Sequence, residues 1–190
     1  MSNEKLLAFT RNFTHLLETH PSEEQILSDG SRLLATLVAS DDWLPEVFAQ
    51  PHPKYYQQYL LYADPLDRLS IVSFVWGPGQ KTPVHDHLTW GIVGMLRGRE
   101  RTTTYEKQAD GSYKATSESV LLPGQTLAVS PNIGDVHEVA NDLSDETSIS
   151  IHVYGANIGR VQRHVFDAKT GAEKSFVSGY ASDRVPNLWS

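Results

Sequence analysis

The 190-residue sequence contains no cysteine. Disulfide bonds, thiolate metal sites and cysteine nucleophiles are therefore excluded. Any transition-metal site must be built from imidazole and carboxylate groups. A chain without cysteine also fits a reducing compartment, so we expect a cytoplasmic location.

Long apolar runs and an excess of basic residues are missing as well. No run approaches the roughly 18 apolar residues that a membrane span needs. The polar start, MSNEKLLAFT, lacks the apolar core of a signal peptide. Acidic residues outnumber basic ones, 23 to 16, which argues against a nucleic-acid surface. We therefore expect neither a membrane nor nucleic acid as a partner, whereas a homo-oligomer is compatible with the sequence.

The pattern of the chain changes near residue 50. Before it, apolar residues recur at helical spacing, with one helix ending before Pro21 and another beginning after Ser22 at a capping-box sequence. After it, short β-rich runs alternate with turn residues about every eight to twelve positions, which is typical of a sandwich or barrel. The strand candidates are YYQQYLLY, LSIVSFVW, GIVGML, RTTTYEK, GSYKATSE, LAVSP, HEVAN, TSISIHVYG and RVQRHVFD. We expect one mainly β domain, residues 1–190, made of a helical segment at 1–50, a barrel at 51–180 and an irregular tail at 181–190.

Two histidines, His85 and His87, stand one residue apart in the stretch PVHDHLTWG. On a strand, residues i and i+2 point to the same face with Cα atoms about 6.6 Å apart, so two ring nitrogens can converge on one ion. Tight binding requires a third ligand, for which His137 in PNIGDVHEVAN is the best candidate. An isolated pair at this spacing is, however, often no metal site. Three histidines would also suit Zn²⁺ as well as iron.

The stretch TSISIHVYG predicts a strand with Ser150, His152 and Tyr154 on one face and apolar residues on the other. If the polar face points into a barrel, each polar group needs a partner, because burying one without a partner costs about 1–3 kcal/mol. The economical arrangement is a chain of hydrogen bonds in which Ser150 orients His152 and His152 contacts the Tyr154 hydroxyl. A polar face turned toward solvent is equally compatible with the pattern.

The spacing around the histidines resembles the two signature motifs of the cupin superfamily. Residues 79–98 read G-x5-H-x-H-x3-G-x6-G, and residues 124–141 read G-x6-P-x2-G-x2-H-x3-N. The resemblance implies a cupin double-stranded β-helix (jelly-roll) barrel that holds one metal ion. The usual cupin has a metal-binding glutamate at the position of Gly91, so this chain would keep three neutral imidazoles and open positions on the metal.

With the later S-x-H-x-Y, these motifs also resemble the bacterial thiol dioxygenases related to cysteine dioxygenase. Members of that family are iron(II) cupins that add both atoms of O₂ to the sulfur of a small aliphatic thiol, giving a sulfinic acid. The resemblance implies that Fe(2+) is bound by His85, His87 and His137. It implies an outer catalytic triad at Ser150, His152 and Tyr154. Because the chain has no cysteine, the tyrosine would act without the thioether cross-link of mammalian-type members.

The substrate is suggested by two further positions. Cysteine-specific members hold the substrate carboxylate with an arginine in a Tyr-x-Arg segment, where this chain has Gln58. A glutamine donates a hydrogen bond but brings no charge. This departure resembles the Gln-type subgroup, whose preferred substrate is 3-mercaptopropionate. Arg163 in RVQRHVFD shares its face with Val161 and Val165 and is therefore expected to point inward. There it would pair either with the substrate carboxylate, as in that subgroup, or with an Asp or Glu of the protein.

The sequence therefore predicts an enzyme, a thiol dioxygenase that acts on O₂ and a small thiol carboxylate, preferably 3-mercaptopropionate. Cysteine and mercaptosuccinate are alternative substrates. Another metal-dependent cupin, such as a zinc or manganese isomerase or hydrolase, is the alternative class, because the ligands alone do not determine the metal.

Overall fold

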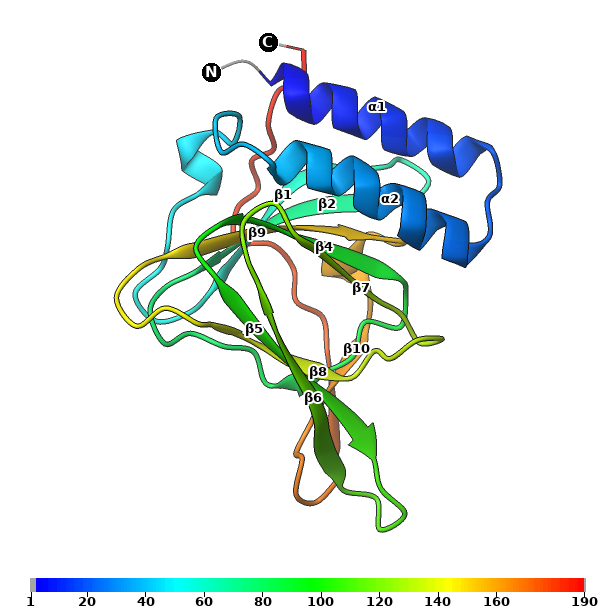
Figure 1. Ribbon diagram of the computed structural model, residues 1–190, viewed down its shortest axis with the longest axis vertical. Coiled ribbons are helices and arrows are strands. Elements are labelled where there is room, and N and C mark those ends of the chain that lie inside the picture. Colours follow the sequence, from blue (N-terminus) through cyan, green and yellow to red (C-terminus); the bar gives the residue numbers. More distant parts are fainter. Residues whose placement is uncertain (1–2, 190) are drawn as a thin grey trace.

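The computed structural model describes residues 3–189. Two N-terminal helices lie side by side over one face of a two-sheet β-structure (Figure 1). The helices are α1 (Glu4–Glu18) and α2 (Glu23–Val38), followed by a short 3₁₀ helix, η1 (Glu46–Phe48). The side chain of Asn3 donates a hydrogen bond to the Asn187 carbonyl at 2.7 Å, so the two ends of the described chain meet beside α1. None of the described helices is both long and apolar enough to cross a membrane.

The strands form two antiparallel sheets. The sheet beneath the helices has the order β1-β2-β9-β4-β7, and the second has the order β11-β10-β3-β8-β5-β6. The first comprises β1 (Gln57–Ala63), β2 (Ser70–Trp76), β4 (Gly91–Arg97), β7 (Thr126–Val129) and β9 (Ser148–Tyr154). The second comprises β3 (Val84–His85), β5 (Glu100–Lys107), β6 (Tyr113–Leu121), β8 (His137–Asn141), β10 (Arg163–Phe166) and β11 (Glu173–Phe176). From β2 to β10 the chain repeatedly crosses between the sheets, which is the double-stranded β-helix of the cupin fold, and the predicted fold class is confirmed.

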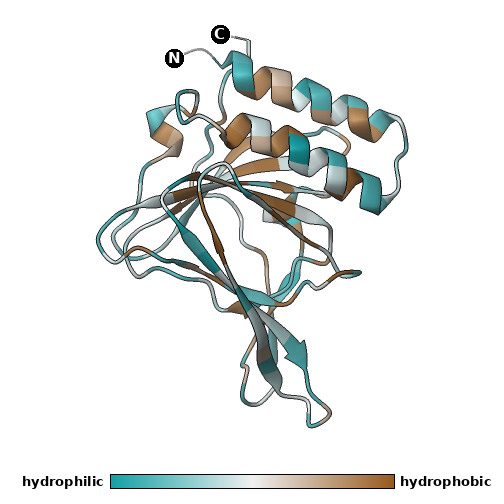
Figure 2. Ribbon diagram, viewed as in Figure 1, coloured by the Kyte–Doolittle hydropathy of each residue, from teal (hydrophilic) through white to brown (hydrophobic). Residues whose placement is uncertain are grey.

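The helices cover the outer face of the first sheet. The predicted capping box at the start of α2 is confirmed, since the Ser22 hydroxyl accepts from the Gln25 amide and the Gln25 side chain accepts from the Ser22 amide. Gly94 of β4 lets α2 approach closely, because a Cβ there would lie 2.7 Å from Cγ of Leu34. The strands beneath the helices are hydrophobic (Figure 2), and their outward side chains share one core with the helices.

The central strand of this sheet, β9, is buried on both faces. Its odd-numbered residues, Ile149, Ile151 and Val153, are fully buried in the core shared with the helices. Its even-numbered residues therefore point into the barrel. The alternative in which the polar face meets solvent is excluded, because the helices cover the apolar face and the second sheet covers the polar one.

Three local expectations differ from the structure. The prediction that His85 and His87 share one strand is wrong: β3 ends at His85, and the chain turns at Leu88, whose φ is 58°. The strand expected at RVQRHVFD begins only at Arg163. Arg160, the first residue of this stretch, is the last residue of a 3₁₀ helix, η2 (Ile158–Arg160). Strand β11 was not predicted, since it is an edge strand whose first three side chains are exposed and show no alternation of apolar residues.

Candidate metal centre

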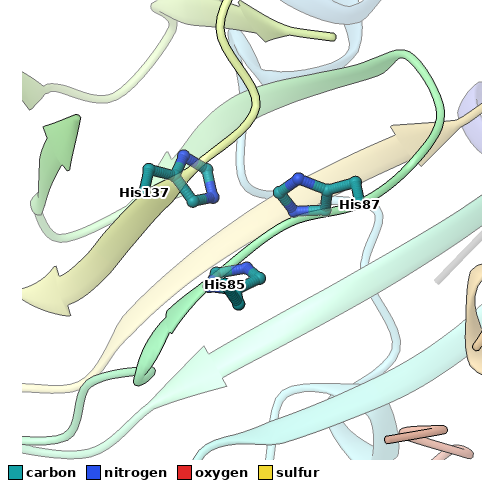
Figure 3. Close-up of side chains that lie close together, drawn as sticks. All are labelled: His85, His87 and His137. Atoms are coloured by element: carbon teal, nitrogen blue, oxygen red, sulfur yellow. The ribbon is translucent and has the colours of Figure 1, made fainter. Parts of the chain in front are cut away.

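Three histidine rings converge inside the barrel. His85 ends β3, His87 lies in the turn that follows, and His137 begins β8 and pairs directly with His85 across the sheet. All three residues are buried, and their potential ligand atoms lie within 4.8 Å of one another. Figure 3 shows the three rings around a common space. The fold thus brings together the three histidines singled out in the sequence as candidate ligands, although one of them is not on a strand.

Two of the rings are held by hydrogen-bond acceptors on their far side. Nδ1 of His85 lies 3.1 Å from the Pro83 carbonyl, and Nδ1 of His87 lies 2.8 Å from the Asp135 carboxylate. Because both partners can only accept, each Nδ1 carries a proton, and Nε2 is the ring nitrogen left for a metal. This is the arrangement in which a histidine binds a metal through Nε2.

Asp135 was missed by the sequence analysis. Its second carboxylate oxygen accepts the backbone N–H groups of His87 and Leu88, both at 2.9 Å. These bonds replace strand pairing at the turn and hold His87 in the site. The only signal in the sequence was an acidic residue two positions before His137, and nothing local indicates that it contacts His87 instead.

The charges of the site suit a divalent cation. Burial, with a smaller contribution from neighbouring His87, lowers the pKa of His85 from 6.5 to about 3, and burial also lowers the pKa of His137 well below its usual value. Both imidazoles are therefore neutral near pH 7. Burial alone would raise the pKa of Asp135, but the hydrogen bond and charge of His87 and the backbone N–H groups together lower it. Three buried imidazoles with one carboxylate behind them fit Fe²⁺, Zn²⁺ or Mn²⁺.

Asp135→Asn is expected to weaken metal binding by about 10–100-fold, as loss of an outer-shell partner does. If the Asn oxygen keeps the two backbone bonds, its amide N–H₂ faces Nδ1 of His87. The imidazole proton would then move to Nε2 and block the metal lone pair. Competition for Fe²⁺ with a chromophoric chelator measures the change. Asp110→Asn, in an exposed turn, is the matched control. Equal affinities of the Asp135 variant and the unaltered protein would contradict the role of Asp135.

A chain of hydrogen bonds lies beside the histidines. Nε2 of His152 is 2.8 Å from the Ser150 hydroxyl, and Nδ1 of His152 is 2.8 Å from the Tyr154 hydroxyl. The Tyr154 ring stacks on His87 with the ring centroids 5.3 Å apart. Burial raises the pKa of Tyr154, so its phenol is protonated near pH 7. The sequence analysis expected this chain of hydrogen bonds as one of two arrangements, and it is present.

Gly91 makes room for the tyrosine. A Cβ at this position would lie 2.9 Å from Cδ1 of Tyr154 and 3.1 Å from Cγ2 of Val129. A glutamate, which the cupin motif usually has here, could not fit without moving the Tyr154 ring. The glycine at position 91 therefore removes the carboxylate that the cupin motif usually has and also leaves space for the Tyr154 ring.

The histidines and the tyrosine line a cavity of about 270 Å³ that also reaches Gln58 and Arg163. Its other walls are largely aromatic and apolar, with Tyr56, Phe74 and Trp76 stacked against one another. This volume lies near the lower end of the range for ligand pockets, which indicates a small ligand. The two residues that the sequence analysis assigned to substrate binding thus lie in the same cavity as the three histidines.

Arg163 is a buried cation that has no carboxylate partner within residues 3–189. It is 4% exposed, its Nη2 donates to the Ser178 hydroxyl at 2.8 Å, and its guanidinium lies 4.7 Å from the centroid of the Phe176 ring. Its Nε has no hydrogen-bond partner, and no Asp or Glu within residues 3–189 forms an ion pair with it. Burial lowers its pKa. The alternative of an internal ion pair is excluded for the described chain, and the guanidinium can accept an anionic group in the cavity.

The chain is similar to several known proteins. Cysteine dioxygenase type 1 of Danio rerio is 24% identical over 108 residues, which are 55% of this chain and 52% of that protein. The enzyme of Rattus norvegicus is 27% identical over the same shares of the two chains. The chain therefore spans about half the length of the curated relatives it matches. A protein of Klebsiella pneumoniae with a double-stranded β-helix domain has a TM-score of 0.48 and 17% identity, and the similarity covers 60% of this chain and 84% of that one.

The sequence model of the family Cysteine dioxygenase type I matches residues 35–168, which are 134 of the 190 residues. The matched region runs from α2 to the end of β10 and contains the three histidines, the Ser150–His152–Tyr154 chain and Arg163. The chain therefore belongs to the cysteine dioxygenase type I family.

Proposed function

We propose that the protein is an iron(II)-dependent thiol dioxygenase, which converts a small thiol carboxylate, RSH, and O₂ into the sulfinic acid RSO₂H. The observation that carries the proposal is one small cavity lined by three buried imidazoles and by a buried guanidinium that has no ion-pair partner within residues 3–189. The iron would be held by His85, His87 and His137. When bound, it would supply open coordination positions and the redox chemistry that O₂ requires. A cytoplasmic location is part of the proposal and is supported by the cysteine-free sequence.

The residues of the chain bind and orient the substrate. Arg163 binds the carboxylate, with its unpaired Nε as one donor, and so fixes the end of the substrate remote from sulfur. Gln58 adds an uncharged hydrogen-bond donor to the same cavity. The aromatic walls exclude water, which strengthens the contact between the guanidinium and the carboxylate. The thiol is thereby held at the histidine end of the cavity, where proximity supplies much of the rate enhancement.

Tyr154 acts at the histidine end. Its protonated phenol can donate a hydrogen bond to a substrate atom at this end of the cavity. His152 holds the phenol oxygen at 2.8 Å, and Ser150 holds the imidazole at the same distance. These two residues fix the direction of the tyrosine and need not touch the substrate themselves.

The preferred thiol is proposed to be 3-mercaptopropionate. The cavity offers one cation for one carboxylate, and its described lining contains no Asp or Glu that could pair with an ammonium group. Cysteine would bring an ammonium group, whereas mercaptosuccinate would bring a second carboxylate. A thiol with a single carboxylate matches the charges of the lining best.

Anaerobic loading with Fe²⁺, followed by oxygen consumption with a panel of thiol acids, tests the function. We expect one O₂ consumed per thiol, a sulfinate product identified by NMR, and the highest kcat/KM for 3-mercaptopropionate. Tight binding of zinc with no oxygen uptake under any loading condition would instead support the zinc or manganese isomerase or hydrolase.

Gln58→Arg tests the choice of substrate. A second guanidinium in the cavity brings the charge that cysteine-specific members have at this position, so the ratio of kcat/KM for cysteine to that for 3-mercaptopropionate is expected to rise. Gln57→Arg is the matched control, because the Gln57 side chain donates to the backbone carbonyls of Tyr55 and Tyr56 and does not line the cavity. An unmoved ratio in the Gln58 variant would refute the substrate argument from this position.

A further inference from the structure

Glu100, the first residue of β5, is a buried carboxyl group that the proposed chemistry leaves unused. It is 1% exposed, and its Oε1 has no hydrogen-bond partner. Within residues 3–189 no Lys, Arg or His forms an ion pair with it. The polar groups that it meets are the Ser150 hydroxyl and the Trp76 indole. Glu100 therefore stands at the far end of the Ser150–His152–Tyr154 chain.

Within residues 3–189, no charged side chain contributes to the pKa of Glu100, and the flanking Arg99 and Arg101 pair with Asp142 instead. Its cross-strand neighbours are Leu121 on β6 and Asn141 on β8. The neighbours of Ser150 are Phe74 on β2 and Met95 on β4. The titratable groups on this side of the barrel are His152 and Tyr154 on β9, which are reached through Ser150.

The missing counter-charge decides the protonation state of Glu100. Burial raises its pKa from 4.5 to about 8, and the hydrogen bonds with Ser150 and Trp76 only partly oppose this. The side chain is therefore mostly a neutral acid at pH 7. In water a glutamate would be ionised at this pH.

When Glu100 is neutral, the hydrogen bonds from Glu100 through Ser150 and His152 to Tyr154 all donate toward Tyr154. The acid donates its proton to the Ser150 oxygen, which also accepts from Nε1 of Trp76 at 3.2 Å. Once its oxygen accepts from Glu100, the serine donates its own proton to Nε2 of His152. The imidazole proton must then lie on Nδ1, where it is donated to the Tyr154 oxygen. The phenol proton remains free to point into the cavity.

An ionised Glu100 reverses the hydrogen bonds that run from Glu100 through Ser150 and His152 to Tyr154. The Ser150 hydroxyl then donates to the carboxylate and accepts from Nε2 of His152. Nδ1 of His152 becomes an acceptor, and it takes the hydrogen bond of the Tyr154 hydroxyl. In this state the tyrosine has no proton to offer to the cavity.

We propose that Glu100 is a positioning residue that donates to Ser150, fixes the tautomer of His152 and so directs the Tyr154 hydroxyl toward the substrate. The catalytic consequence rests on the proposed thiol oxidation, whereas the tautomer of His152 does not. The chain of hydrogen bonds has four members, and its direction is determined by the member farthest from the metal site.

The direct test is the tautomer of His152, read from ¹⁵N NMR of the full chain labelled at histidine and loaded with diamagnetic Zn²⁺. Wild-type protein is expected to carry the proton on Nδ1 at pH 6.5 and on Nε2 at pH 9.5. Glu100→Gln should keep the Nδ1 tautomer at both pH values, because its amide donates to Ser150 and cannot ionise. Glu118→Gln, on the exposed part of β6, is the matched control and should behave as wild type.

The kinetic test uses the iron-loaded enzyme. Wild-type kcat is expected to fall about tenfold per pH unit above the pKa of Glu100. In Glu100→Gln this fall should be absent, while kcat at pH 6.5 and KM at both pH values stay close to wild type. A residue needed only for packing would lower activity evenly and leave the shape of the pH profile unchanged.

Ser150→Ala supplies a second variant that does not alter Glu100. It removes the hydroxyl that connects Glu100 to His152, so the His152 tautomer should no longer change with pH. In the Ser150→Ala background, Glu100→Gln should have no further effect. The inference is overturned if wild type and Glu100→Gln show the same His152 tautomer at both pH values. If the tautomer responds as expected but no thiol yields sulfinate, the positioning role stands and the proposed reaction fails.

Discussion

Replacing His137 by alanine is expected to abolish stoichiometric iron binding and to lower thiol oxidation by at least about 100-fold. The estimate is a lower limit, because loss of an outer-shell partner alone costs up to about that factor. Two imidazoles would remain, and His87 would keep its bond to Asp135, so the variant isolates the third ligand. Metal content by mass spectrometry and oxygen uptake after anaerobic loading give the two readouts.

The control for this variant is His15→Ala. His15 lies on the exposed side of α1, where it contacts Glu18, and it does not line the cavity of the three histidines. It should retain full iron and full activity. If His137→Ala retained one iron per chain and oxidised thiols at the original rate, His137 would not be a ligand and the three-histidine site would have to be abandoned.

Arg163→Gln is expected to reduce kcat/KM for 3-mercaptopropionate by roughly 30- to 3,000-fold. Removing one partner of a buried, hydrogen-bonded charge pair costs about 2–5 kcal/mol, and each 1.4 kcal/mol is a factor of ten. Arg163→Lys should recover part of the loss, because it restores the charge but not the two-pronged geometry. Steady-state kinetics with the iron-loaded variants measures both effects.

A thiol without a carboxylate separates binding from packing. Oxidation of 2-mercaptoethanol should change little in Arg163→Gln, since this substrate offers nothing for the guanidinium to bind. Arg160→Gln, at the exposed end of η2, is the control on the same segment. An equal loss for the charged and the uncharged thiol would mean that Arg163 supports the fold of the cavity and does not bind the substrate.

Local patterns in the sequence determined much of the fold. The capping box at Ser22 was predictable because a helix start depends on residues three apart. The two faces of β9 followed from simple alternation. Which face points inward was not predictable, because it depends on helices more than a hundred residues earlier in the chain. The alternation alone fits a surface strand equally well.

The candidate site was predictable in its histidines and not in their partners. Asp135 reaches His87 across 48 positions in the sequence, and Glu100 reaches Ser150 across two different sheets. Such contacts depend on which residues of distant strands lie opposite each other. The alternation of polar and apolar residues within one strand does not determine this register. The same limit explains why Arg163 could be placed inward from alternation, while its lack of a carboxylate partner required the structure.

The double burial of β9 ties stability to chemistry. Ile151 packs beneath the helices, and the next residue, His152, orients the Tyr154 hydroxyl. A shift of the helical layer by a fraction of an ångström would therefore move this hydroxyl within the cavity. Substitutions far from the cavity, such as Gly94→Ala beneath Leu34, should therefore alter turnover before they unfold the protein. The N-terminal helices serve as a rigid backing that holds the reactive groups in register.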